Sequence, residues 1–76
     1  MKEKFLDLIQ EILEIDDRKL QMSDKFKEFK EWDSLALLSV IAMIDSEYDV
    51  QIESMEMEKL STMEDLYNAI IVKQNK

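Results

Sequence analysis

The chain contains neither glycine nor proline in its 76 residues, and this restricts how it can fold. Glycine supplies the positive-φ positions of many tight turns, and proline presets others. Without either residue the chain has no Gly-rich phosphate loop and favours helices joined by polar loops. A chain of this length buries only about 60% of its unfolded surface on folding, which leaves no room for a deep substrate cavity. We therefore expect one small all-α domain over residues 1–76.

Apolar residues that recur at helical spacing predict four helices. The main ones cover residues 2–15, 34–47 and 62–73, and a short one lies within 54–60. The first and the last of these helices each present an apolar stripe to a core. The stripe of the first helix contains Phe5, Leu6, Leu8, Ile9, Ile12 and Leu13. The stripe of the last helix contains Met63, Leu66, Tyr67 and Ile70. The expected architecture is a four-helix bundle of three main helices and one short helix, with a long loop between the first two.

The loop over residues 16–33 is longer than most connections in a compact domain, so we expect its apolar side chains to pin it to the core. These side chains are Leu20, Met22, Phe26 and Phe29. A short helical turn is expected over residues 24–29, and Val50 and Ile52 should point inward further along the chain. The expected helix caps are Ser23 or Asp24 for the turn, Ser54 for the short helix, and Ser61 with Glu64 or Thr62 with Asp65 for the last helix.

The second predicted helix has more apolar surface than one core-facing stripe requires. At about 100° per residue, one face contains Leu37, Val40, Ile41, Ile44 and the following Tyr48. A different face contains Leu35, Leu38 and Ala42, with Asp45 beside them. This surplus either marks a contact with another protein or is covered by the long loop before it, and the sequence favours neither.

The charge of the chain argues against several classes of partner. Eighteen acidic residues against ten basic ones give a net charge of −8. Phosphate backbones and anionic membranes bind positive surfaces, so we expect neither nucleic acid nor a membrane as a partner. No stretch resembles a signal peptide or a membrane span, which favours a cytoplasmic protein. The acidic surface is either simply solvated, which is the simpler interpretation, or steers the protein toward basic patches on others.

Two residue types that often perform catalysis are missing. There is no His and no Cys, so neither a Ser-His triad nor a thiolate metal site can form. Ser34 is not followed by an S-x-x-K pattern, and no EF-hand spacing occurs, so no metal site is expected. We therefore expect a protein that is not an enzyme, with a small hydrolase using Ser34 as a minor alternative.

One serine stands where a polar loop meets an apolar helix, in Glu31-Trp32-Asp33-Ser34-Leu35. The first N–H groups of a helix lack partners and the helix dipole is positive there, so a phosphodiester on Ser34 is favoured. The dipole contributes about 0.3–1 kcal/mol at an exposed position, which tunes such a site and does not create it. Asp33 is the expected cap, and its carboxylate is placed to help hold a metal ion for a modifying enzyme. From these letters alone, ordinary helix-start residues are the simpler interpretation.

The order of motifs resembles the acyl carrier protein family, also called phosphopantetheine-binding carrier domains, over essentially the whole chain. The Asp-Ser-Leu motif of the family corresponds to Asp33-Ser34-Leu35. In the family the next helix ends in acidic and aromatic residues and runs into an extended segment, which corresponds to residues 45–52 here. The acidic short helix of the family corresponds to residues 56–60, and the start of its last helix, which begins with Thr, corresponds to residues 61–66. The resemblance implies a right-handed four-helix bundle whose Ser34 accepts 4′-phosphopantetheine from coenzyme A. A separate phosphopantetheinyl transferase, usually with Mg²⁺, would make this transfer, and the thiol of the arm would carry an acyl or aminoacyl group as a thioester.

Departures from the family bear on its partners. Trp32 precedes Asp33 where the family commonly has Gly, which is similar to stand-alone carriers of specialised pathways as much as to those of fatty-acid synthesis. Fatty-acid carriers often place acidic residues on the partner face of the second helix, where this chain has Ala36 and Ser39. Of the acidic residues near this face, Asp45 and Glu47 remain. Docking is therefore expected to use Leu35, Leu38 and Ala42 more than charge, with Asp45 as the charged contact.

The resemblance implies a monomeric carrier that serves an acyl- or aminoacyl-loading ligase and downstream enzymes of fatty-acid or specialised-metabolite biosynthesis. A second interpretation is an unmodified acidic helical module that binds a basic partner. It is motivated by the net charge and by the surplus apolar face.

Overall fold

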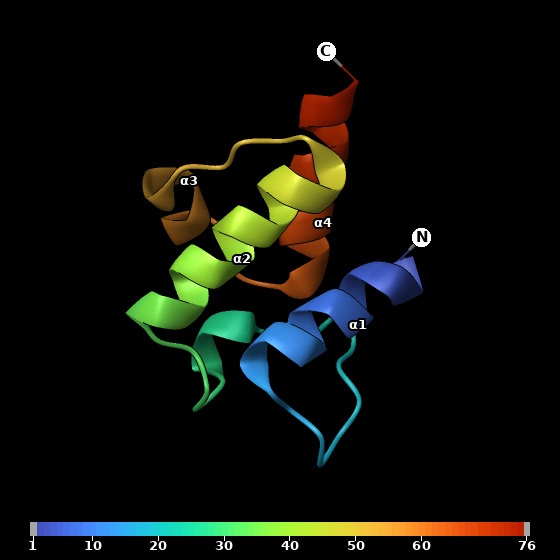
Figure 1. Ribbon diagram of the computed structural model, residues 1–76, viewed down its shortest axis with the longest axis vertical. Coiled ribbons are helices and arrows are strands. Elements are labelled where there is room, and N and C mark those ends of the chain that lie inside the picture. The colour runs from blue at the N-terminus through green and yellow to red at the C-terminus, as the bar shows by residue number, and fades with distance from the viewer. Residues whose placement is uncertain (1, 76) are drawn as a thin grey trace.

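A computed structural model describes residues 2–75, and within them the chain forms four α-helices and no strand (Figure 1). The helices are α1 (Lys2–Leu13), α2 (Ser34–Tyr48), α3 (Ser54–Glu58) and α4 (Met63–Gln74), and a 3₁₀ turn, η1 (Phe26–Glu28), lies in the long loop. The expected all-α architecture, with three main helices, one short helix and a long first connection, is confirmed.

The three long helices contact one another in pairs and enclose the core between them. In α1 and α4 the deepest residues follow the predicted stripes, while Leu6, Leu8, Ile12 and Tyr67 are only half-buried. Val50 and Ile52 point inward as expected. The buried helix residues are Phe5, Ile9 and Leu13 from α1, Ala36, Val40 and Ile44 from α2, Met57 from α3, and Met63, Leu66 and Ile70 from α4.

Helix α1 ends two residues earlier than expected because the chain turns into a left-handed conformation at Glu14, with φ of 56°. The N–H of Glu14 donates to the carbonyl of Glu11 (3.1 Å), and the N–H of Ile15 donates to the carbonyl of Gln10 (3.0 Å). This bond pair is the Schellman ending that glycine usually provides. Ile15 is buried after the turn, and its burial offsets the steric cost of a non-glycine residue there.

The long loop is held on the core by the apolar side chains expected to do so. Leu20 and Phe26 are buried, and Met22 and Phe29 pack against the same cluster. The expected helical turn is shorter than residues 24–29, and neither Ser23 nor Asp24 caps it: Lys25 precedes η1 without a side-chain cap. The carboxylate of Asp24 instead accepts the N–H of Gln21 at 2.8 Å, which stabilises the preceding turn.

The loop also caps the start of α4. Its carbonyls at Asp24 and Met22 accept the N–H groups of Met63 and Glu64, both at 2.9 Å. The next two N–H groups of α4 bond to Thr62, so all four N–H groups that a helix start leaves free are satisfied.

The expected caps of the two C-terminal helices are partly confirmed. Thr62 and Asp65 form the predicted capping box, whereas the alternative pairing of Ser61 with Glu64 is wrong, because the N–H of Ser61 donates to Asp65 (3.1 Å). Ser54 is the first residue of α3 and not its cap. Glu53 takes the cap position.

Candidate attachment site at the start of α2

Ser34 is the first residue of α2, and its side chain is exposed. Asp33 caps the helix as expected. Its carboxylate Oδ1 accepts the N–H of Ala36 (2.8 Å), and its carbonyl accepts the N–H of Leu37 (2.9 Å). The hydroxyl of Ser34 is therefore presented to solvent on a helix start whose position is fixed by its cap.

The start of α2 differs from the start of α4 in the N–H groups that it leaves free. Asp33 occupies only the third and fourth of them, and within residues 2–75 the N–H groups of Ser34 and Leu35 have no protein acceptor. No loop covers these two groups as residues 22–24 cover the start of α4. Free N–H groups at the positive end of a helix are suited to an anion such as a phosphate.

The chain ahead of Ser34 is anchored by Trp32. The indole ring of Trp32 packs on the ring of Phe26, with the ring centroids 4.9 Å apart. The backbone N–H of Trp32 donates to the backbone carbonyl of Phe29 (3.0 Å). Since Phe26 is fully buried, these contacts tie the approach to Ser34 directly to the core.

An ion pair that the sequence did not predict joins the two ends of the long loop. The guanidinium of Arg18 holds the carboxylate of Glu31 and lies over the ring of Phe29, 5.2 Å from its centroid. The hydrogen bonds from Arg18 keep the pKa of the Glu31 carboxyl below its ordinary value. Gln10 of α1 holds the backbone of Arg18, because its side-chain amide donates to the carbonyl of Arg18 (3.0 Å). One feature of the sequence could have indicated this ion pair, because Arg18 is the only arginine in an acidic chain. The planar guanidinium of arginine is suited to two parallel hydrogen bonds to one carboxylate.

The structure separates the two faces of α2. Leu35 is 73% exposed and Leu38 is 60% exposed, and Ala42 and Asp45 are also at the surface. The long loop does not cover this face, so that alternative is wrong. Ala36 is 8% exposed and points into the core, so its predicted place on the partner face is also wrong; Ser39 is half-buried.

A second segment repeats the local arrangement of the site. In Glu53-Ser54-Met55, an acidic residue at the cap position precedes an exposed serine at the first position of α3, and Met55 is 71% exposed. The helices differ in length, because α2 has 15 residues and α3 has five. A short helix aligns fewer peptide dipoles, so its start attracts an anion less strongly.

Two other kinds of site are absent from residues 2–75. No helix in this range is long and apolar enough to cross a lipid bilayer. No group of three His, Cys, Asp or Glu side chains in the same range is placed to hold a metal ion.

Comparison with known proteins shows the family and the fold of the chain. Residues 3–70 match the family described as "Phosphopantetheine attachment site". An acyl carrier protein of Petrotoga mobilis is 32% identical over 73 residues, covering 96% of this chain and 86% of that protein. An acyl carrier protein of Clostridium acetobutylicum is 32% identical over 68 residues, covering 90% of this chain and 88% of that protein. The solution NMR structure of a holo acyl carrier protein from Geobacter metallireducens has the same fold, with a TM-score of 0.78 at 19% identity over 95% of this chain and 83% of that one.

The helical fold and the match over most of its length define a phosphopantetheine-binding carrier domain. The chain belongs to the acyl carrier protein family, whose prosthetic group is 4′-phosphopantetheine. The resemblance found in the sequence is thereby confirmed for the family, the fold and the cofactor.

Proposed function

We propose that Ser34 carries the 4′-phosphopantetheine arm and that the protein delivers acyl or aminoacyl groups between enzymes. The observation that carries this assignment is an exposed hydroxyl at the start of a 15-residue helix, beside two N–H groups without protein acceptors in residues 2–75. When bound, the arm supplies a terminal thiol, which holds the carried group as a thioester.

The residues around Ser34 fit such a group. Leu35 beside it is mostly exposed, and the hydroxyl is at the surface, so a bulky phosphodiester has room there. The free N–H groups of Ser34 and Leu35 favour its negative charge. The carboxylate of Asp33 is held by the N–H of Ala36.

The attachment step needs a nucleophile from this chain and a base from elsewhere. The Oγ of Ser34 forms a bond to the phosphorus of coenzyme A that bears the pantetheine, the phosphoanhydride bond breaks, and adenosine bisphosphate leaves. The hydroxyl proton must pass to a base, and the chain has no His to take it. We therefore assign this step to a separate phosphopantetheinyl transferase, and assign no catalysis to the carrier itself. Asp33 is placed to help that enzyme hold its metal ion.

The arm explains how a chain without cysteine takes part in thioester chemistry, because the sulfur arrives with the cofactor. Tethering raises the effective concentration of the carried group at each enzyme in turn. We propose that a monomeric carrier of this kind, a single domain over residues 1–76, serves a loading ligase and downstream enzymes of fatty-acid or specialised-metabolite biosynthesis. Leu35, Leu38, Ala42 and Asp45 are the proposed docking contacts.

The mass of the protein after incubation with coenzyme A and a promiscuous phosphopantetheinyl transferase tests the assignment. We expect a gain of one phosphopantetheine group, lost in Ser34→Ala and kept in Ser54→Ala. Ser54 is a matched control because it also begins a helix behind an acidic residue. No gain, or a gain that survives Ser34→Ala, would refute the assignment.

A second candidate function is an unmodified acidic module that binds a basic partner through the exposed apolar face of α2. The intact mass of the protein from its native cell distinguishes the two. A modified fraction favours the carrier, and a wholly unmodified protein with a stable bound partner favours the module.

A further inference from the structure

The two flanks of α2 near Ser34 differ in charge. A shallow hollow lies between the end of α1 and the first turn of α2. Its lining combines the apolar side chains of Ile12 and Leu35 with the carboxylates of Glu14, Glu31 and Asp33, and contains no basic side chain. This hollow therefore combines apolar and acidic side chains directly beside the proposed attachment site.

Within the hollow, Glu14 is the carboxylate with the fewest partners. Glu31 is paired with Arg18, and Asp33 accepts the N–H of Ala36. Glu14 has no cation within ion-pair distance in residues 2–75, and the left-handed turn at the end of α1 fixes its backbone. Its side chain is exposed, borders both this hollow and the one beside it at the end of α1, and remains available to a partner.

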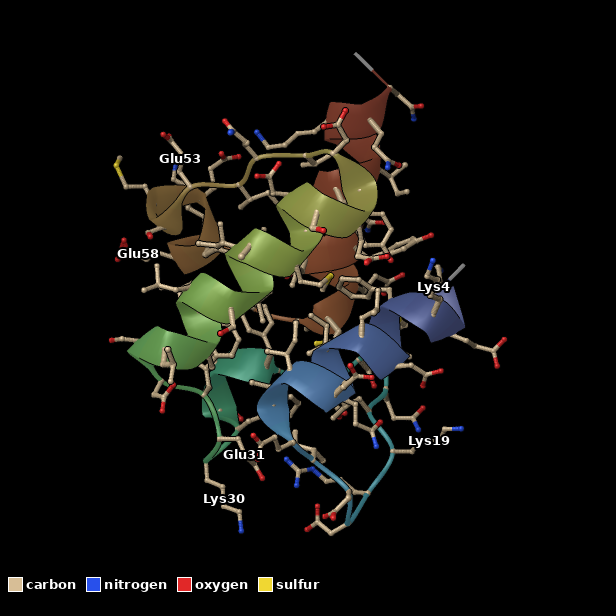
Figure 2. The ribbon with its side chains drawn as sticks, in the orientation of Figure 1. Lys4, Lys19, Lys30, Glu31, Glu53 and Glu58 are labelled. Carbon is tan, nitrogen blue, oxygen red and sulfur yellow. The ribbon has the colours of Figure 1, made fainter. Side chains whose placement is uncertain are left out.

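The opposite flank of α2, facing α3, has no comparable excess. The hollow there is lined by Trp32, Leu37 and Met57, with one cation, Lys27, and one anion, Glu58. The ammonium group of Lys27 donates to the backbone carbonyl of Glu58 (2.6 Å), which holds it in place. Figure 2 shows Glu58 and Glu31 on opposite sides of α2, with Lys30 extending away from the helix.

We propose that the transferase that modifies Ser34 docks with its apolar contact on Leu35 and Leu38 and its basic side chains over the α1 flank, where Glu14 lies. Complementary charge at the edge of an apolar contact speeds association and fixes orientation. The proposal rests on the proposed function, because it assumes that Ser34 is the residue modified. It adds an electrostatic contact on the α1 flank to the one proposed at Asp45, because residues 34–44 of α2 have no charged side chain.

Charge reversal at three matched positions tests the proposal. Glu14→Lys, Glu11→Lys and Glu58→Lys change the net charge equally. Glu11 lines a hollow at the end of α1 that Glu14 also borders but that no residue of α2 lines, and Glu58 lies on the α3 flank. The measurement is kcat/KM for phosphopantetheinylation by a promiscuous transferase with coenzyme A, at low and high salt. Melting curves verify that each variant is folded.

We expect Glu14→Lys to lower kcat/KM about tenfold or more at low salt, with most of the loss recovered at high salt, and the other two variants to stay within about threefold of the unaltered protein. Equal losses in all three variants would show that only net charge matters and would overturn the proposal, as would a larger loss in Glu58→Lys. If the unaltered protein gains no mass, or Ser34→Ala still does, the proposed function itself fails.

Discussion

Arg18 and Glu31 form a two-bond ion pair that joins the ends of the loop between α1 and α2. Nη2 of Arg18 lies 3.0 Å from Oε1 of Glu31, and Nη1 lies 3.5 Å from Oε2. Since Glu31 comes shortly before Ser34 in the chain, the pair limits the motion of the segment that presents the proposed attachment site.

We predict that Arg18→Gln loosens this segment with little effect on the stability of the whole domain. Exposed ion pairs contribute little to the free energy of unfolding, whereas a loop can open locally without global unfolding. Amide hydrogen exchange should become faster at Trp32, whose N–H is bonded within the loop, while exchange in α4 stays unchanged. The double variant with Arg18→Glu and Glu31→Arg should restore slow exchange at Trp32. Unaltered exchange at Trp32 in Arg18→Gln would contradict the role given to the pair.

Asp33 has two separable roles, as helix cap and as a charge beside Ser34. Asp33→Ala should lower the free energy of unfolding by about 1 kcal/mol, because the N–H of Ala36 loses its acceptor. In a domain of this size, that lowers Tm by about 4–8 °C. Asp33→Asn should keep most of the stability, since an amide oxygen also caps a helix.

The rate of phosphopantetheinylation then distinguishes the two roles of Asp33. If its carboxylate helps the transferase to hold a metal ion, Asp33→Asn is modified more slowly although it is as stable as the unaltered protein. An unaltered rate in Asp33→Asn would show that Asp33 acts only as a cap.

Asp65 should make the stability of the domain depend on pH. The N–H groups of Thr62 and Ser61 donate to its carboxylate (3.2 and 3.1 Å), and these bonds hold the pKa of Asp65 below its ordinary value. A lowered pKa in the folded state means that the carboxylate stabilises the fold above the ordinary Asp pKa of about 3.9, and that this contribution is lost as the pH falls through the lowered pKa.

We therefore expect Asp65→Asn to have a lower Tm than the unaltered protein at neutral pH, with the difference shrinking below about pH 4. Thermal melts from neutral to acid pH measure it, with Glu64→Gln as the control on the same helix turn. A difference between Asp65→Asn and the unaltered protein that stays constant with pH would show that the negative charge of Asp65 does not stabilise the fold.

The helices could be predicted from the sequence because their signals are local. Apolar spacing located α1, α2 and α4, and the hydroxyl and carboxylate at Thr62 and Asp65 located one start. The turn at Glu14 was missed because a glutamate in a left-handed conformation has no sequence signature. It is stabilised by the burial of Ile15, which depends on the assembled core.

The loop contacts could not be predicted because they join residues far apart in the chain. The carbonyls of Met22 and Asp24 cap α4, and Arg18 reaches Glu31, and neither contact follows from a periodic pattern. The candidate site shows the same limit, since Ser54 stands in the same local arrangement as Ser34. At the level of the sequence, the order of motifs along the whole chain, which carries the family resemblance, indicated Ser34.

The exposed leucines of α2 should affect partners and not folding. Leu38 is 60% exposed, so Leu38→Ala creates no cavity and should change the free energy of unfolding by less than about 0.5 kcal/mol. Val72 on α4 is 64% exposed, and Val72→Ala is the matched control.

Because apolar anchors at the centre of an interface often contribute more than about 1 kcal/mol, Leu38→Ala should lower kcat/KM for phosphopantetheinylation about fivefold or more. The loss should come as a raised KM with little change in kcat, since the side chain contacts the transferase in the ground state and the transition state alike. Val72→Ala should leave both constants unchanged. If Leu38→Ala is modified as efficiently as Val72→Ala, the exposed face of α2 is not where the transferase docks.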